Sequence, residues 1–166
     1  LVVSRGGYVR VPEVTLVDVP TLLVLGMQTK GRYADTPAVI GEIVRYGMAN
    51  GAQLAGMPVS LMHEGSGEAA MKADLEGTAV IDVAFPIAKP VPSGERVKCY
   101  ELPGGRMAKG VHKGPYSACG PAYSALFEWL AKHGLRVTGL PREVSLNDPR
   151  KVKPEELLTE IYAPVD

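Results

Sequence analysis

The stretch VTLVDVP at residues 14–20 is followed by a similar stretch, VKCYELP, at residues 97–103, an offset of 83 residues. Valine, an acidic residue and proline hold matching positions in the two stretches. The same offset, half the length of the 166-residue chain, pairs further residues in the same order along both halves. These pairs are Gly31 with Gly114, Tyr33 with Tyr116, Tyr46 with Trp129, Gly51 with Gly134, Gly56 with Gly139 and Pro58 with Pro141.

The two halves also end alike, because IDVAFPI at residues 81–87 matches TEIYAPV at residues 159–165. Matches that keep their order along both halves indicate duplication, and so long a period indicates a duplicated subdomain rather than a solenoid. We therefore expect one domain over residues 1–166, made of halves at about 12–88 and 95–166. A proline-containing linker at residues 89–94 joins them, and the two halves are predicted to superpose.

Each half predicts the same order of elements. Residues 14–28 and 97–112 are expected to be extended, with a proline turn in the middle of each. A helix follows, from about Thr36 to the residue before Gly51 in the first half, and from about Pro121 to the residue before Gly134 in the second. Two strands close each half, so the predicted class is α+β. The Gly- and Ser-containing stretch 63–76 is predicted to be a flexible loop.

Composition excludes several classes of protein. Lys plus Arg equals Asp plus Glu at 18 each, which argues against a nucleic-acid surface. No apolar run approaches the roughly 18 residues of a membrane span, and the first ten residues lack the pattern of a signal peptide. Cys99 and Cys119 are expected to be reduced thiols in a cytoplasmic protein. The three histidines are scattered, so we expect no metal site and no cofactor.

The last predicted strand of each half contains one acidic residue in its interior. Asp82 alternates with Ile81 and Val83, and Glu160 precedes Ile161 in the same pattern, so each acid lies on the face opposite the apolar side chains. Acids are depleted in strand interiors. Each carboxylate either points to water or sits in a cavity, where a cationic ligand would offset its desolvation. Tyr162 shares the face of Glu160.

Aromatic residues repeat at matching positions of the two halves. Tyr33 and Tyr116 each precede a predicted helix, whereas Tyr46 and Trp129 lie on matching helical positions. Aromatic rings supply flat apolar area and can hold a cation on their faces. The alternatives are core packing for the helical pair and turn anchoring for Tyr33 and Tyr116.

Four segments resemble one known family: HKGPY (112–116), EWLAKHG (128–134), EVSLNDP (143–149) and PEELLTEIYAPV (154–165). They are similar to the GyrI-like small-molecule-binding family, which also supplies the effector-binding domain of multidrug-sensing transcription regulators. The resemblance covers roughly residues 12–166. It implies two pseudo-twofold-related strand–helix–strand–strand modules that form a curved antiparallel sheet with two main helices and a central cleft.

The resemblance also implies site residues. Glu160 stands where the family carries a central-strand glutamate that meets cationic, lipophilic ligands, and Asp82 is the corresponding acid of the first module. Tyr116 and Trp129 match aromatic positions of the second module. With His112 from the first segment, the predicted ligand-binding residues are Glu160, Tyr162, Asp82, Tyr116, Tyr33, Trp129 and His112. No catalytic set can be matched residue by residue.

The expected function is binding of a lipophilic, cationic organic compound in a cleft between the halves, for multidrug sensing or sequestration. Two alternatives stay open: hydrolysis of strained cyclopropane-containing toxins in the same cleft, and a protein-interaction role such as modulation of gyrase. Regulators of this type carry a DNA-binding module ahead of this domain. Only about twelve residues precede the resemblance here, so we expect a stand-alone protein or a fragment that does not itself bind nucleic acid or a membrane.

Overall fold

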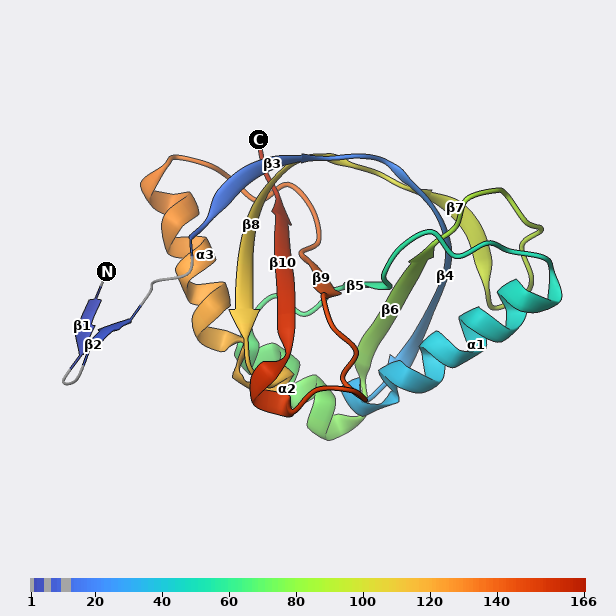
Figure 1. Cartoon of the computed structure of the whole chain (residues 1–166), viewed down its shortest axis with the longest axis horizontal. Helices are drawn as coiled ribbons and strands as arrows, with labels where there is room; N and C mark the ends of the chain where they lie inside the picture. The colour runs from blue at the N-terminus through green and yellow to red at the C-terminus, as the bar shows by residue number, and fades with distance from the viewer. Residues whose placement is uncertain (1, 5–6, 10–12) are drawn as a thin grey trace.

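The structure, a computed structural model, describes residues 2–4, 7–9 and 13–166 (Figure 1). Near the N-terminus, β1 (Val2–Ser4) and β2 (Gly7–Val9) form an antiparallel pair. The rest of the described chain forms one eight-stranded antiparallel sheet and three α-helices. The strands are β3 (Thr15–Val19), β4 (Leu22–Gly31), β5 (Val59–Leu61), β6 (Ala79–Pro86), β7 (Lys98–Leu102), β8 (Gly105–Lys113), β9 (Arg142–Ser145) and β10 (Leu158–Pro164).

The strand order is β3-β8-β10-β9-β5-β6-β4-β7, and the sheet curves into a half-barrel (Figure 1). This order reads the same from either end when β3, β4, β5 and β6 are exchanged for β7, β8, β9 and β10. The first strand of each half pairs with the other half, β3 with β8 and β7 with β4, while β5 and β9 meet in the middle. The fold class is as the sequence predicts. An overlay of the two halves stays a prediction.

The two predicted helices are α1 (Thr36–Ala49) and α3 (Gly120–Lys132). Each has a proline in its first turn, where the missing N–H costs nothing. Each ends before a glycine in the left-handed region, Gly51 with φ of 72° and Gly134 with φ of 65°. Residues other than glycine rarely adopt this backbone conformation. None of the helices in the described ranges is long and apolar enough to cross a membrane.

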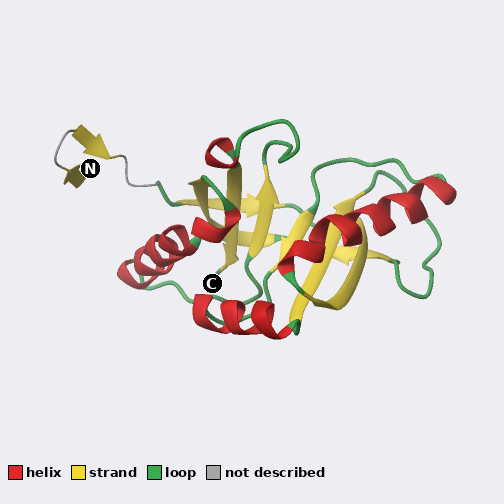
Figure 2. Ribbon diagram, turned by 90° about the horizontal axis from the view of Figure 1, so that it is seen from below, coloured by secondary structure: helices red, strands yellow, loops and turns green. Residues whose placement is uncertain are grey.

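The third helix, α2 (Gly67–Glu76), corrects the prediction that residues 63–76 are a flexible loop. Ser66 caps it by accepting a hydrogen bond from the Ala69 N–H at 3.0 Å, and Gly77, with φ of 69°, ends it. The sequence hid this helix because its large apolar side chains, Met71 and Leu75, are exposed and mark no buried face. Along the sheet, α2 lies between α3 and α1 (Figures 1 and 2).

The helices cover one face of the sheet, here called the helix face. Ile43 of α1 packs in one buried cluster with Leu25 and Val83, and Leu126 of α3 packs in a second cluster with Ile161. Because side chains alternate along a strand, the neighbours of these residues point to the other side of the sheet. A third cluster, which includes Val24, Ala84, Val59 and Tyr100, lies there, and we call this side the open face.

Candidate functional site

Glu143 lies at the middle of the sheet, where the two halves meet. It stands on β9 directly opposite Ser60 of β5 and next to Ile161 of β10. Ile161 belongs to the cluster under α3, so Glu143 points to the helix face as well. There the hydroxyl of Tyr123, on α3, donates a hydrogen bond to the Glu143 carboxylate. A central acid on the helix face is therefore held by a residue of α3.

The environment of Glu143 disfavours its charge. Burial raises the pKa of this carboxyl above its usual range, while the hydrogen bond from Tyr123 and the nearby His112 act in the opposite direction. In the described part of the chain, Glu143 forms no ion pair within 4.0 Å. A cation placed beside this carboxylate would remove the penalty of its desolvation.

Two other titratable groups lie close enough to feel the Glu143 charge. Burial, and then Glu143, raises the pKa of the Cys119 thiol to about 12, so this thiol stays protonated at neutral pH. Burial, then the hydrogen bond to Glu64, raises the pKa of Tyr33, and Glu143 adds to this shift. Tyr33 comes from the first half and Cys119 from the second, so both halves contribute to the surroundings of Glu143.

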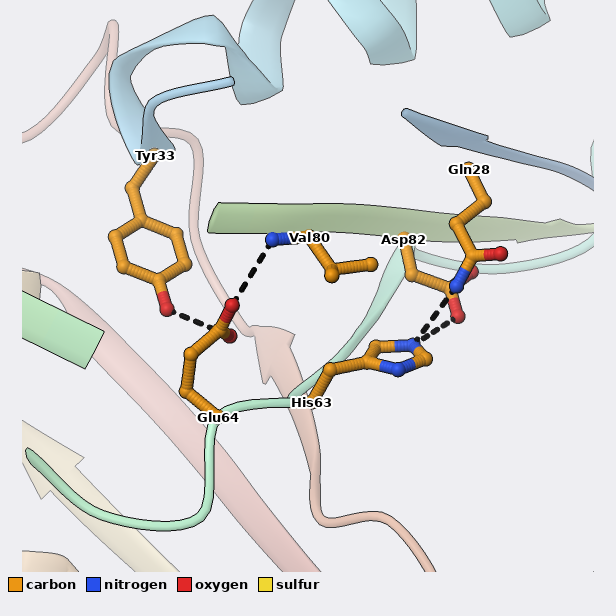
Figure 3. A network of polar contacts seen from close by, with 6 residues as sticks. All are labelled: Gln28, Tyr33, His63, Glu64, Val80 and Asp82. Carbon is orange, nitrogen blue, oxygen red and sulfur yellow. Dashed lines mark hydrogen bonds and ion pairs between the residues drawn. The ribbon is translucent and has the colours of Figure 1, made fainter. Parts of the chain in front are cut away.

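Tyr33 is fixed by a small polar network (Figure 3). Its hydroxyl donates to Glu64 at 2.8 Å, and the other oxygen of Glu64 accepts the Val80 N–H at 2.9 Å. The Tyr33 N–H donates to Asp74 of α2 at 2.8 Å. Although burial acts to raise it, the pKa of Glu64 is lowered by the bonds from Val80 and Tyr33. The ring of Tyr33 is thus tied to β6 through Glu64, and its backbone is tied to α2 through Asp74.

A hollow of about 410 Å³ opens on the second half beside the start of α3. It is lined by Val111, His112, Lys113, Ala118, Pro121 and Ala122. His112 lines this hollow, and it is also among the groups that lower the pKa of Glu143. Tyr116 lies on the same face, and its hydroxyl is 2.9 Å from the Ser145 hydroxyl, two residues along β9 from Glu143.

The two acids singled out in the sequence lie on the open face instead, and each already has a partner. Glu160 forms an ion pair with Lys109 of β8 and accepts a hydrogen bond from Tyr162 at 3.1 Å. Asp82 is 2.7 Å from the Nε2 atom of His63, which also lies 3.2 Å from Gln28 (Figure 3). Neither acid is the unpartnered carboxylate that its position in a strand suggests.

The predicted site residues therefore separate into groups. Tyr33, Tyr116 and His112 share the helix face with Glu143, whereas Asp82, Glu160 and Tyr162 occupy the open face. Trp129 is in neither group: its ring stacks on His133 with the centroids 3.8 Å apart, and it packs against the cluster under α3. Within the described ranges, no group of three or more His, Cys, Asp or Glu side chains could hold a metal ion.

Sequence reasoning missed Glu143 and Tyr123. The signal for Glu143 was the same as for Asp82, an acid inside a short strand, here in REVS at residues 142–145. Tyr123 carried only a weak signal, because it follows Ala122 on a helix whose apolar face was already assigned to the core. Its hydrogen bond to Glu143 joins residues that are twenty positions apart in the sequence and meet only in the folded chain.

Comparison with known proteins assigns a family. The sequence model described as the GyrI-like small molecule binding domain matches residues 12–166. No curated protein sequence matches the chain significantly.

Among solved structures, the EcmrR C-terminal domain is similar, with a TM-score of 0.82, 21% identity, and coverage of 95% of this chain and 99% of that one. A hydrolase from Listeria innocua has a TM-score of 0.63 and 16% identity, and the match covers 93% of this chain and 92% of that one. SAV2435 bound to tetraphenylphosphonium has a TM-score of 0.56 and 13% identity, and the match covers 93% of this chain and 94% of that one. At such identities these structures share the fold with this chain.

Proposed function

Because the chain belongs to the GyrI-like family of small-molecule-binding domains, we propose that it binds a lipophilic organic cation on the helix face of the sheet, with Glu143 as the anchor. The observation that carries the proposal is the state of that carboxylate. It is partly buried at the junction of the two halves, its pKa is raised by burial, and the described residues give it no ion pair. A cationic ligand would stabilise its charged form.

The neighbours of Glu143 suit a lipophilic cation that carries aromatic rings. Tyr33, Tyr116 and Tyr123 offer ring surfaces, and a ring face attracts a cation by about 0.5–2 kcal/mol. The hollow beside α3, lined mainly by apolar groups, leaves room of about 410 Å³ next to His112. This lies within the range of roughly 300–1,000 Å³ that is usual for small-molecule pockets. The relative bound to tetraphenylphosphonium adds support, since that ligand is a lipophilic cation.

The decisive experiment is a calorimetric titration of the full chain with a matched pair of ligands. Tetraphenylphosphonium is the cation, and triphenylphosphine oxide is the neutral compound with similar rings. In Glu143→Gln, the cation should lose about 1.5–3 kcal/mol of binding free energy, roughly 10- to 150-fold in affinity, because a charge-assisted contact is gone. The neutral compound should lose much less.

A matched control is Glu155→Gln, which makes the same substitution at an exposed acid in η3 (Pro154–Glu156). It should leave both affinities unchanged. Equal losses for the cation and the neutral compound in Glu143→Gln would show that the charge of Glu143 is not the anchor. No binding of either compound to the wild type would overturn the proposed ligand class.

Hydrolysis is the second candidate, and one observation favours it. A carboxyl whose pKa is raised by burial stays protonated to higher pH and so can act as a general acid, with the Tyr123 hydroxyl beside it. A strained cyclopropane ring, opened as water adds across it, is the substrate class that suits such an acid. Chromatography of a cyclopropane-containing compound after incubation with wild type and Glu143→Gln distinguishes the two candidates: conversion by the wild type alone supports hydrolysis, and recovery of unchanged compound supports binding.

A further inference from the structure

Arg142 is a buried arginine on the open face, with most of its hydrogen-bonding groups unused. It is 7% exposed and precedes Glu143 on β9, so the two side chains point to opposite faces of the sheet. One terminal nitrogen donates to the Pro103 carbonyl oxygen. The Nε atom is buried and has no hydrogen-bond partner among the described residues. A guanidinium has five N–H donors, so this one is poorly satisfied.

The charge of Arg142 is also unpaired in the described part of the chain. Among the described residues no carboxylate lies within 4.0 Å of it, and the open-face acids Asp82 and Glu160 are paired with His63 and Lys109. Burial lowers the pKa of Arg142, and the nearby Tyr100 acts against that shift. A buried cation without a counter-ion is destabilising, because its lost hydration is not replaced. An anion reaching this guanidinium would offset that cost.

A hollow of about 230 Å³ lies beside Arg142. Its lining is mainly apolar and includes Leu22, Val59, Val144 and Tyr162. Residues of both halves contribute. The volume is smaller than the roughly 300 Å³ of the smaller drug-sized pockets, so only a small ligand fits. The combination of apolar walls and one guanidinium matches an organic acid with a single ring or a short branched chain.

We infer that this hollow binds a small apolar carboxylate through Arg142, at a second site separate from the cation site on the helix face. The carboxylate would accept hydrogen bonds from the terminal N–H groups of the guanidinium that the Pro103 carbonyl leaves free. Its apolar part would cover Leu22, Val59 and Val144. The inference does not depend on the proposed function, because Glu143 and Arg142 serve opposite faces.

The test uses benzoate and its neutral counterpart benzamide, with nitrogen-15 NMR spectra of the full chain. The side-chain Nε–H signal of Arg142, assigned through its own backbone signals, should shift with benzoate to saturation and should not move with benzamide. Arg142→Lys keeps a positive charge but lacks the fork of donors, so it should weaken benzoate binding by at least roughly tenfold. Glu155→Gln, at the exposed acid of η3, is the control, and it should bind benzoate like the wild type.

The wild-type titration decides the matter even if Arg142→Lys fails to fold. An Arg142 signal that does not saturate with benzoate, or that shifts equally with benzamide, would overturn the inference. So would a folded Arg142→Lys that binds benzoate as tightly as the wild type. Loss of tetraphenylphosphonium binding in Glu143→Gln with intact benzoate binding would show two independent sites.

Discussion

Ser60 and Glu143 lie directly opposite each other in the pairing of β5 with β9, and they are separated in the sequence by 83 residues, the offset of the predicted repeat. Thr21 and Gly104, also 83 residues apart, are joined by a hydrogen bond of 3.1 Å. If the predicted duplication holds, such pairs face each other where an axis relating the two halves passes between them, and the pairing of β5 with β9 joins one half to the other. Glu143 therefore occupies the junction of the halves, with a serine rather than a second acid across from it.

The stability of the protein should depend on pH through Glu143. Its folded-state pKa is raised by burial, so its contribution to folding is full below the unfolded pKa and is lost as pH rises through the folded pKa. The wild type should therefore lose free energy of unfolding relative to Glu143→Gln as the pH rises above the unfolded pKa of a glutamate, about 4.3. Urea denaturation of both proteins across this range measures the difference.

Glu155→Gln is the control for this pH series, and its curve should run parallel to that of the wild type. If Glu143→Gln and the wild type also run parallel, the Glu143 carboxyl is not titrating differently in the folded state. Addition of tetraphenylphosphonium should reduce the wild-type loss at the higher pH, because the cation stabilises the ionised carboxylate.

Glu160→Gln separates the site implied by family resemblance from the site built around Glu143. The sequence predicts that Glu160 anchors the cation, whereas in the structure its carboxylate is paired with Lys109. Because the Glu160 carboxylate is already paired in the wild type, we expect Glu160→Gln to change tetraphenylphosphonium affinity by less than about threefold. Loss of the ion pair should cost roughly 1 kcal/mol of stability. Calorimetry and urea denaturation measure the two effects. A large, cation-specific loss of affinity in Glu160→Gln would show that Glu160, and not Glu143, binds the cation.

The alternation in residues 81–87 and 159–165 predicted correctly that Asp82 and Glu160 lie opposite the apolar side chains of their strands. It carried no information on their partners, because Lys109 comes from β8 and His63 from the segment after β5. Nor did it reveal which face of the sheet presents the acid that lacks an ion pair. The surroundings of Glu143, including the hydrogen bond from Tyr123 of α3, form only when the chain folds.

Gly104 should tolerate no side chain. A Cβ atom built on it would lie 2.0 Å from the Val19 carbonyl oxygen, because the turns before β4 and β8 cross closely at this point. Backbone cannot yield as a flexible side chain can, so Gly104→Ala should lose about 3 kcal/mol of unfolding free energy or fail to fold. Gly120→Ala is the control, since nothing lies within 4 Å of its Cβ position. Its stability should stay within about 1 kcal/mol of the wild type in the same urea titration. Equal stabilities of the two variants would contradict this account.

The last prediction concerns Tyr33 and Tyr116, which the repeat relates and which both stand on the helix face. If their rings line the cation site, the ring and not the hydroxyl should matter for binding. Tyr33→Phe and Tyr116→Phe should keep tetraphenylphosphonium affinity within about twofold, while the Leu variants should lose about 0.5–2 kcal/mol each. The hydroxyl matters elsewhere: Tyr33→Phe removes the bond to Glu64, which should cost roughly 1 kcal/mol of stability.

Calorimetry on the four variants separates these effects, and urea denaturation reports the loss of the hydroxyl. The two positions need not respond equally, because Tyr116 is 45% exposed whereas Tyr33 is held by Glu64 and Asp74. A fixed ring loses less freedom when a ligand binds, so the larger loss is expected for Tyr33→Leu. Unchanged affinity in both Leu variants would remove the two rings from the site and leave them as anchors of η1 (Tyr33–Asp35) and η2 (Tyr116–Ala118), the turns that precede α1 and α3.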